Sequence, residues 1–260
     1  NMKAHCLGFA YYSNVPCVIL METFAIYWLI RSKKMERLFL ILSLPVHILV
    51  YKVCTVRLEF YVYIIFMLAV LILGSINVNK QHKFMTCIAT FMYPLAAVSV
   101  ILASLKYKSS AIIFAFNEMI NSRLKFNLQG FEQYGVNLIG QRIKSNQEYI
   151  DQNFVNHYFY IDCGYVYMLI GYGLILFAII MFLYTYLSHY AMKTNNIKLI
   201  SWCFAICVFS IINNIMFNTA LNPLLILGIK LLLSNKTSDG KRGWMPNRVV
   251  TKRRRIKIKL

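Results

Sequence analysis

Long apolar runs are the feature that most restricts how this chain can fold. Each is near the length at which a helix crosses the roughly 30 Å hydrocarbon core of a bilayer, about 17 to 25 residues. The runs are Leu7–Ile30, Leu38–Cys54, Phe60–Val78, Phe84–Leu105, Gly164–Ser188 and Leu199–Leu233. The last run is long enough for two short spans hinged near Asn218 and Pro223, so the sequence predicts six or seven spans.

The overall composition supports a membrane protein. Hydrophobic residues make up 59% of the chain and charged residues only 14%, whereas a soluble domain is typically about 25% charged. Backbone groups inside lipid must be hydrogen-bonded within the spanning structure, and the runs lack the period-two alternation of barrel strands. The predicted fold class is therefore all-α, a polytopic membrane protein.

The distribution of positive charge predicts the orientation of the chain. The net charge of +19 could suggest nucleic-acid binding, but the basic residues gather in alternate connections, which is the pattern of the positive-inside rule. These basic residues follow the first, third and fifth runs and close the chain: Arg31, Lys33, Lys34, Arg37, Lys80, Lys83, Lys193, Lys198, Lys252, Arg253, Arg254, Arg255, Lys257 and Lys259. We expect these connections and the C-terminus to be cytoplasmic, with no nucleic-acid partner.

The chain accordingly divides into four parts. They are a four-span bundle (1–105), an extracytoplasmic segment (106–162), the remaining spans (163–235) and a basic cytoplasmic tail (236–260) that would face anionic lipid.

The extracytoplasmic segment is the one polar interval and holds five of the nine acidic residues. Apolar residues three and four apart predict an amphipathic helix over Ala111–Leu128, lying along the membrane surface. Gly130, Gly135 and Gly140 interrupt the stretch that follows, and the sequence then becomes polar, as in a water-exposed loop or short helix.

Two arginines of this segment could bind phosphate. A guanidinium above a membrane surface suits bidentate contact with a phosphate group, which makes Arg123 and Arg142 candidates, with Gln141 placed to orient Arg142. Snorkelling or a surface ion pair would explain either arginine equally simply.

His157 and Asp162, just before the fifth run, could take a proton from a hydroxyl group, because partial burial moves such a pKa toward neutrality. The simpler interpretations are a helix N-cap for Asp162 and a hydrogen-bonded structural role for His157. Within the spans, Glu22 and His47 are the ionisable residues, and polar groups at that depth are functional candidates by default.

The seven cysteines contain no CxxC pair and lie mostly in apolar runs, where they behave as small hydrophobic residues. We expect neither a zinc site nor a disulfide framework.

Three stretches resemble Wzy-type bacterial polysaccharide polymerases, which are related to the O-antigen ligases. NEMINSRLKFNLQGFEQYGVNLIGQ resembles the opening of their outward loop, with its Arg-Leu pair and the Tyr-Gly and Gly-Gln that close it. YIDCGYVYMLIGYGLILFAIIMFLYTYL is similar to the family's next block, and FNTALNPLLI to the polar turn before its last span. The resemblance covers about Asn117–Leu233, so the chain would correspond to the later part of such a protein.

The resemblance implies a GT-C-like membrane glycosyltransferase of the bacterial cytoplasmic membrane. It would join oligosaccharide repeat units carried on undecaprenyl diphosphate, without metal or other cofactor, since the diphosphate is already a good leaving group. By the same resemblance Arg123 would contact the diphosphate, assisted by Arg142, and Tyr165 would line the sugar path. Asp162, ranked above His157, would orient or deprotonate the acceptor hydroxyl. The basic tail could bind a chain-length regulator.

Two other functions remain open at this point. A seven-span receptor fits the deduced topology and Asn222-Pro223 in a final span, but SINVNKQHK stands where a DRY-like triplet is expected. A lipid-linked sugar flippase or other transporter should show internal repeats and charges near the midplane, and no repeat is visible.

Overall fold

The computed structural model describes residues 14–75, 83–119, 122–143, 160–214 and 222–237. These residues form helices and no strand, which confirms the all-α prediction. The helices are α1 (Asn14–Leu29), α2 (Lys33–Cys54), α3 (Leu58–Ser75), α4 (Lys83–Thr90), α5 (Met92–Lys106), α6 (Ala111–Met119), α7 (Arg123–Tyr134), α8 (Gly164–Gly171), α9 (Gly173–Lys193), α10 (Ile197–Ile212) and α11 (Leu224–Thr237).

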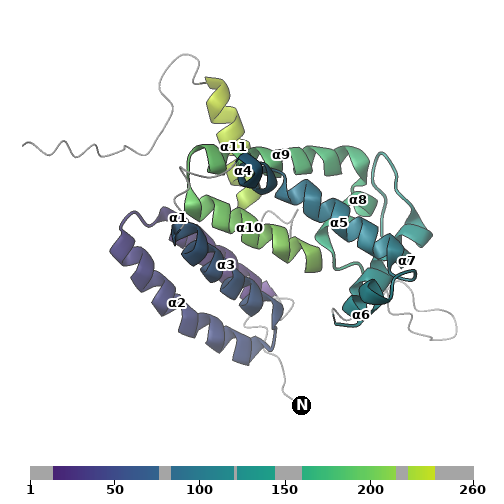
Figure 1. Cartoon of the computed structure of the whole chain (residues 1–260), viewed down its shortest axis with the longest axis horizontal. Coiled ribbons are helices and arrows are strands. Elements are labelled where there is room, and N and C mark those ends of the chain that lie inside the picture. Colours follow the sequence, from purple (N-terminus) through teal and green to yellow (C-terminus); the bar gives the residue numbers. More distant parts are fainter. Residues whose placement is uncertain (1–13, 76–82, 120–121, 144–159, 215–221, 238–260) are drawn as a thin grey trace, which may run out of the picture.

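Helix α10 lies at the centre of this arrangement (Figure 1). It packs against α3 and α1 on one side and against α9, α5 and α8 on the other. Ten of its residues are buried, among them Trp202, Cys203 and Phe209. At 16 residues, it is about 24 Å long by the 1.5 Å rise of a helix.

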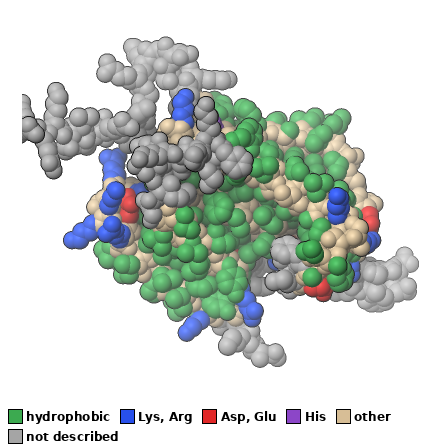
Figure 2. Space-filling model, viewed as in Figure 1, with side chains coloured by type: hydrophobic (Ala, Val, Ile, Leu, Met, Phe, Trp, Pro, Cys, Tyr) green, Lys and Arg blue, Asp and Glu red, His purple; other side chains and the backbone are tan. Residues whose placement is uncertain are grey.

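Within the part of the chain that the structure describes, two helices are long and apolar enough to cross a membrane, α2 and α9, and five others are apolar but shorter. Large apolar side chains of α2 and α3 point outward, including Ile41, Leu49 and Leu71, which are about 60% exposed. Figure 2 shows hydrophobic side chains over most of the visible face, with Lys and Arg gathered at its edges. This distribution is typical of a surface that contacts lipid.

Two of the predicted spans are interrupted rather than continuous. The run Phe84–Leu105 is divided at Phe91 between α4 and α5, and the run Gly164–Ser188 is divided at Tyr172 between α8 and α9. Apolar composition is the same on both sides of each break, so hydropathy gave no sign of it.

Backbone hydrogen bonds join the segment after α7 to the residues on both sides of the break between α8 and α9. Leu174 and Ile175 donate their N–H groups to the carbonyls of Asn137 and Leu138, and Gln141 donates to the carbonyl of Gly171. These bonds satisfy groups that a helix end leaves unpaired.

Glycine is required on both sides of this contact. Gly173 has a φ of 84°, which favours glycine. A Cβ atom on Gly140 would lie 2.0 Å from the Gly171 carbonyl oxygen, far inside van der Waals contact.

Two basic connections meet at the end of the bundle where α10 begins. Lys198 Nζ lies 2.6 Å from Glu36 Oε1 and also donates to the carbonyl of Ile30. The α1–α2 and α9–α10 connections, each flanked by basic residues, therefore share one end of the bundle.

Replacing Gly140 by alanine should destabilise the protein, because the new methyl group meets backbone atoms that cannot rotate away. We expect the unfolding temperature of the Gly140→Ala variant in detergent to fall by several degrees, which corresponds to a loss of about 2 kcal/mol or more in the free energy of unfolding. Unfolding is monitored by tryptophan fluorescence. Gly228→Ala is the matched control, since its Cβ would make only ordinary contacts, the nearest at 3.8 Å. Equal unfolding temperatures for the two variants would contradict the close contact.

Candidate functional site

Arg123 and Asp162, two candidate residues from well-separated positions in the polar segment 106–162, lie in contact. Arg123 Nε is 3.4 Å from Asp162 Oδ2, and the side chains are 23% and 32% exposed. Arg123 is the first residue of α7, and Asp162 lies just before α8. The ion pair is thus only partly shielded from solvent.

The Arg123 guanidinium also binds the end of the central helix. Its Nη1 atom donates a hydrogen bond to the carbonyl of Ile212, the last residue of α10. Carbonyls in a last helical turn lack partners within the helix, and positive charge is favourable there. One side chain therefore joins α7, α10 and the segment before α8.

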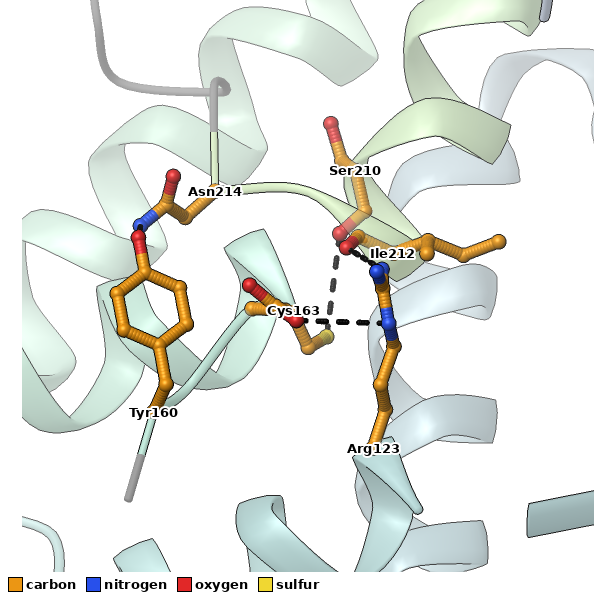
Figure 3. A network of polar contacts seen from close by, with 7 residues as sticks. Arg123, Tyr160, Cys163, Ser210, Ile212 and Asn214 are labelled. Atoms are coloured by element: carbon orange, nitrogen blue, oxygen red, sulfur yellow. Dashed lines mark hydrogen bonds and ion pairs between the residues drawn. The ribbon is translucent and has the colours of Figure 1, made fainter. Parts of the chain in front are cut away.

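The segment that carries Asp162 lies close against the end of α10 (Figure 3). A Cβ atom on Gly164 would lie 2.8 Å from the Asn213 carbonyl oxygen. The Cys163 thiol is 3.8 Å from the Ser210 carbonyl oxygen, and Asn214 donates to the Tyr160 hydroxyl at 3.4 Å. These contacts fix the backbone on either side of Asp162.

The turn between α6 and α7 sets the position of Arg123. Ser122 has a φ of 58°, a left-handed conformation that interrupts a helical backbone, and α7 begins at the next residue. The buried Asn117 side chain accepts a hydrogen bond from the N–H of Lys125 at 3.1 Å, which satisfies one of the unpaired donors at the start of α7. The predicted single helix over Ala111–Leu128 is therefore wrong, because the chain turns sharply at Ser122.

Helix α7 is anchored at two further points. The buried Asn127 donates to the Ser104 hydroxyl of α5 at 3.1 Å. Gly130 lies inside α7, where a Cβ would come within 2.6 Å of the Ile161 side chain. Gly130 does not interrupt the helix as expected; its small size lets α7 approach the residue next to Asp162.

The environment of Asp162 affects the pKa of its carboxyl group in two opposite ways. Burial raises the pKa of Asp162 above its ordinary value, and the positive charge of Arg123 offsets part of that rise. The residue that precedes α8 as its cap is Cys163, and no side-chain capping hydrogen bond is present there. The N-cap interpretation of Asp162 is therefore wrong.

The sequence analysis missed a third charged residue in this neighbourhood. Glu59 lies in the first turn of α3 and is only 2% exposed. Its Oε2 atom has no hydrogen-bond partner among the described residues. Glu59 stands one residue before a predicted span, where an acid passes for an ordinary flanking charge, so only its burial identifies it.

The other predicted site residues have different surroundings. Gln141 Nε2 donates to the Tyr134 carbonyl at 2.7 Å, and its Oε1 accepts from Asn137 at 2.9 Å, so its side chain organises the turn after α7. Arg142 is exposed. Tyr165 is completely buried and its hydroxyl donates to the Cys207 carbonyl at 3.0 Å, so it packs inside the bundle and does not line an open path. His157 lies outside the described residues.

The two ionisable residues expected inside the spans also differ from each other. Glu22 is exposed on α1. His47 is buried, stacks on the Tyr63 ring at 3.9 Å and lies 3.0 Å from the Thr23 hydroxyl. Thr23 gives its own proton to the Ile19 carbonyl, so His47 Nε2 must be the donor to Thr23. These contacts fit a hydrogen-bonded structural role for His47.

Comparison with protein-family models, with curated proteins and with solved structures finds no match to this chain.

Loss of Arg123 should cost more stability than loss of the Asp162 charge. The Arg123→Leu variant leaves both the Ile212 carbonyl and the carboxylate without their partner, at about 1 to 3 kcal/mol, whereas Asp162→Asn keeps a side-chain oxygen that can still accept. Lys108→Leu is the control, because its ion pair with Glu132 is 65% and 57% exposed and should contribute less than about 1 kcal/mol. In thermal unfolding in detergent, Arg123→Leu should therefore lose the most stability, Asp162→Asn less and Lys108→Leu the least. A Lys108→Leu variant as unstable as Arg123→Leu would contradict this account of the site.

Proposed function

We propose that this protein is a membrane glycosyltransferase that polymerises oligosaccharide repeat units carried on undecaprenyl diphosphate. The observation that carries the proposal is the Arg123–Asp162 ion pair. A guanidinium and a carboxylate from two separate stretches of the polymerase resemblance lie 3.4 Å apart at one end of the helical bundle. These are the two functional groups that such a reaction requires.

The proposed reaction needs no metal, because the residues supply its charge and its base. The acceptor hydroxyl attacks the anomeric carbon, a new glycosidic bond forms, and the bond from that carbon to the diphosphate oxygen breaks. The hydroxyl proton passes to the Asp162 carboxylate, whose raised pKa suits a general base. The Arg123 guanidinium stabilises the negative charge that develops on the departing diphosphate.

The ion pair has to open for this reaction. In the structure the Asp162 carboxylate lies against Nε of the guanidinium, and the Ile212 carbonyl accepts a hydrogen bond from its Nη1 atom. A diphosphate that bound Arg123 would compete with Asp162 for the guanidinium and release the carboxylate toward the acceptor. Substrate binding would thus assemble the base and the anion site in one step.

The proposed site would face outward from a bacterial cytoplasmic membrane that the chain crosses several times. Arg123 binds the last residue of α10 and Lys198 is near its first residue, so the site and the basic connections lie at opposite ends of that helix. By the positive-inside rule, the end with Lys198 is cytoplasmic. A lipid-linked donor presented at the outer surface would then reach Arg123 directly.

This orientation can be measured with single cysteines. We expect Leu138→Cys, on the segment after α7, to react with a membrane-impermeant maleimide in intact cells. Lys34→Cys, in the first turn of α2, should react only after permeabilisation. Both sites are exposed, and the exposed Cys87 is first replaced by serine. Labelling of both from outside, or the reverse pattern, would reject the proposed orientation.

The activity can be measured through the length of surface polysaccharide on gels. A strain that lacks the gene should make only single repeat units, and wild type should restore long chains. Arg123→Ala and Asp162→Asn should not restore them at equal membrane levels, whereas Lys108→Ala, an exposed cation outside the site, should. Unchanged chain length in the deletion strain would reject the polymerase and favour a transporter or receptor.

A further inference from the structure

The end of the bundle opposite the candidate site carries a group of exposed cations. The connection between α1 and α2 and the first turns of α2 contribute Arg31, Lys33, Lys34 and Arg37, all of them exposed. Lys193, the last residue of α9, is exposed at the same end. In Figure 2, Lys and Arg side chains gather at the left edge, where α2 and α10 begin in Figure 1.

The acid that the described residues place among these cations is already paired. Glu36 Oε1 lies 2.6 Å from Lys198 Nζ, and each side chain is only 19% exposed. The Lys198 ammonium also faces the Tyr27 ring, 5.2 Å from its centre. The charges of Glu36 and Lys198 therefore cancel, and within the described part of the chain the five exposed cations form no ion pair.

The charge of these residues is unfavourable where it stands. Lys33 and Lys34 are the first two residues of α2, and positive charge is disfavoured at that end of a helix. Ser32, the residue that precedes the helix, makes no side-chain capping hydrogen bond. The neighbouring cations also repel one another. An anion bound among them would reduce both penalties.

Exposed apolar side chains adjoin the cations. Leu29, Met35 and Leu38 are 66%, 52% and 45% exposed, and they alternate with the basic residues along the chain. Ile41 and Leu42, one turn beyond Leu38, continue the exposed apolar face of α2. A free phosphate has no use for such side chains. A phospholipid, in contrast, offers a phosphate to the cations and acyl chains to the apolar residues.

We propose that this cationic surface, defined by Arg31, Lys33, Lys34, Arg37 and Lys193, binds anionic phospholipids of the inner leaflet. The lipid phosphates lie among the five side chains, and the acyl chains run along the exposed face of α2. Bound lipid would hold the connection between α1 and α2 at the depth of the headgroups. This surface does not depend on the reaction proposed for the other end of α10.

The test is the quenching of Trp28 by phospholipids with brominated acyl chains. Trp28 lies in the last turn of α1 and is half-buried. Trp202, 6.5 Å away between ring centres, is 3% exposed, and Trp244, outside the described residues, is first replaced by phenylalanine. The protein is placed in vesicles of equal parts phosphatidylglycerol and phosphatidylcholine, with bromine on one lipid or the other. The fluorescence then compares the two lipids at this end of the bundle.

We expect phosphatidylglycerol to be favoured over phosphatidylcholine in the wild type by a relative association constant of about five or more, since one Lys or Arg near an anionic surface contributes about fivefold. The Lys33→Gln/Lys34→Gln variant should bring this ratio close to one. Lys106→Gln/Lys108→Gln is the matched control, because it removes two exposed cations near the C-terminal end of α5, and it should keep the wild-type ratio.

A ratio of one in the wild type would overturn the lipid surface and favour a soluble acidic partner, even if the double variant did not fold. A ratio that survives the Lys33→Gln/Lys34→Gln replacement, or that falls equally in the control variant, would also overturn it. Excess glycerol 1-phosphate separates a lipid from a free phosphate. The preference should persist in its presence, and loss of the preference would show that the cations take a soluble anion instead.

Discussion

The Arg123 guanidinium connects the elements that form the candidate site. Helix α10 is buried along most of its length, and its last carbonyl has no partner within the helix. Arg123 supplies that partner from α7 and also holds the Asp162 segment against the same helix end. One side chain therefore links α7, α10 and the segment before α8 at this end of the bundle, and its own position depends on the left-handed turn at Ser122.

The opposite end of α10 uses the same arrangement with a different cation. Lys198 contacts the Glu36 carboxylate and the carbonyl of Ile30, as Arg123 contacts Asp162 and the carbonyl of Ile212. A cation that joins a helix-end carbonyl to a carboxylate is thus an ordinary way to hold this bundle together.

The sequence was sufficient for the helical class and for the two partners of the ion pair. Arg123 and Asp162 could be selected because charged residues are rare in this chain and both stand in its one polar interval. Glu59 could not, because only burial separates it from an ordinary charge at the edge of an apolar run. Gln141 and Tyr165 looked like site residues since hydrogen-bonding groups near a loop suggest ligand contact, whereas both groups bind carbonyls of the protein itself. The breaks at Phe91 and Tyr172 were also invisible, because hydropathy does not record where a helix changes direction.

The segment after α7 is joined to the break between α8 and α9 by main-chain hydrogen bonds. The carbonyls of Asn137 and Leu138 bind Leu174 and Ile175, and the N–H of Gln141 binds Gly171. Main-chain hydrogen bonds ignore the identity of the side chains around them but depend on the number of residues between them. The identities of the exposed residues Val136, Leu138 and Ile139 can therefore vary at this contact. The insertion or deletion of a single residue there would shift these hydrogen-bonding groups out of register with those at the break between α8 and α9.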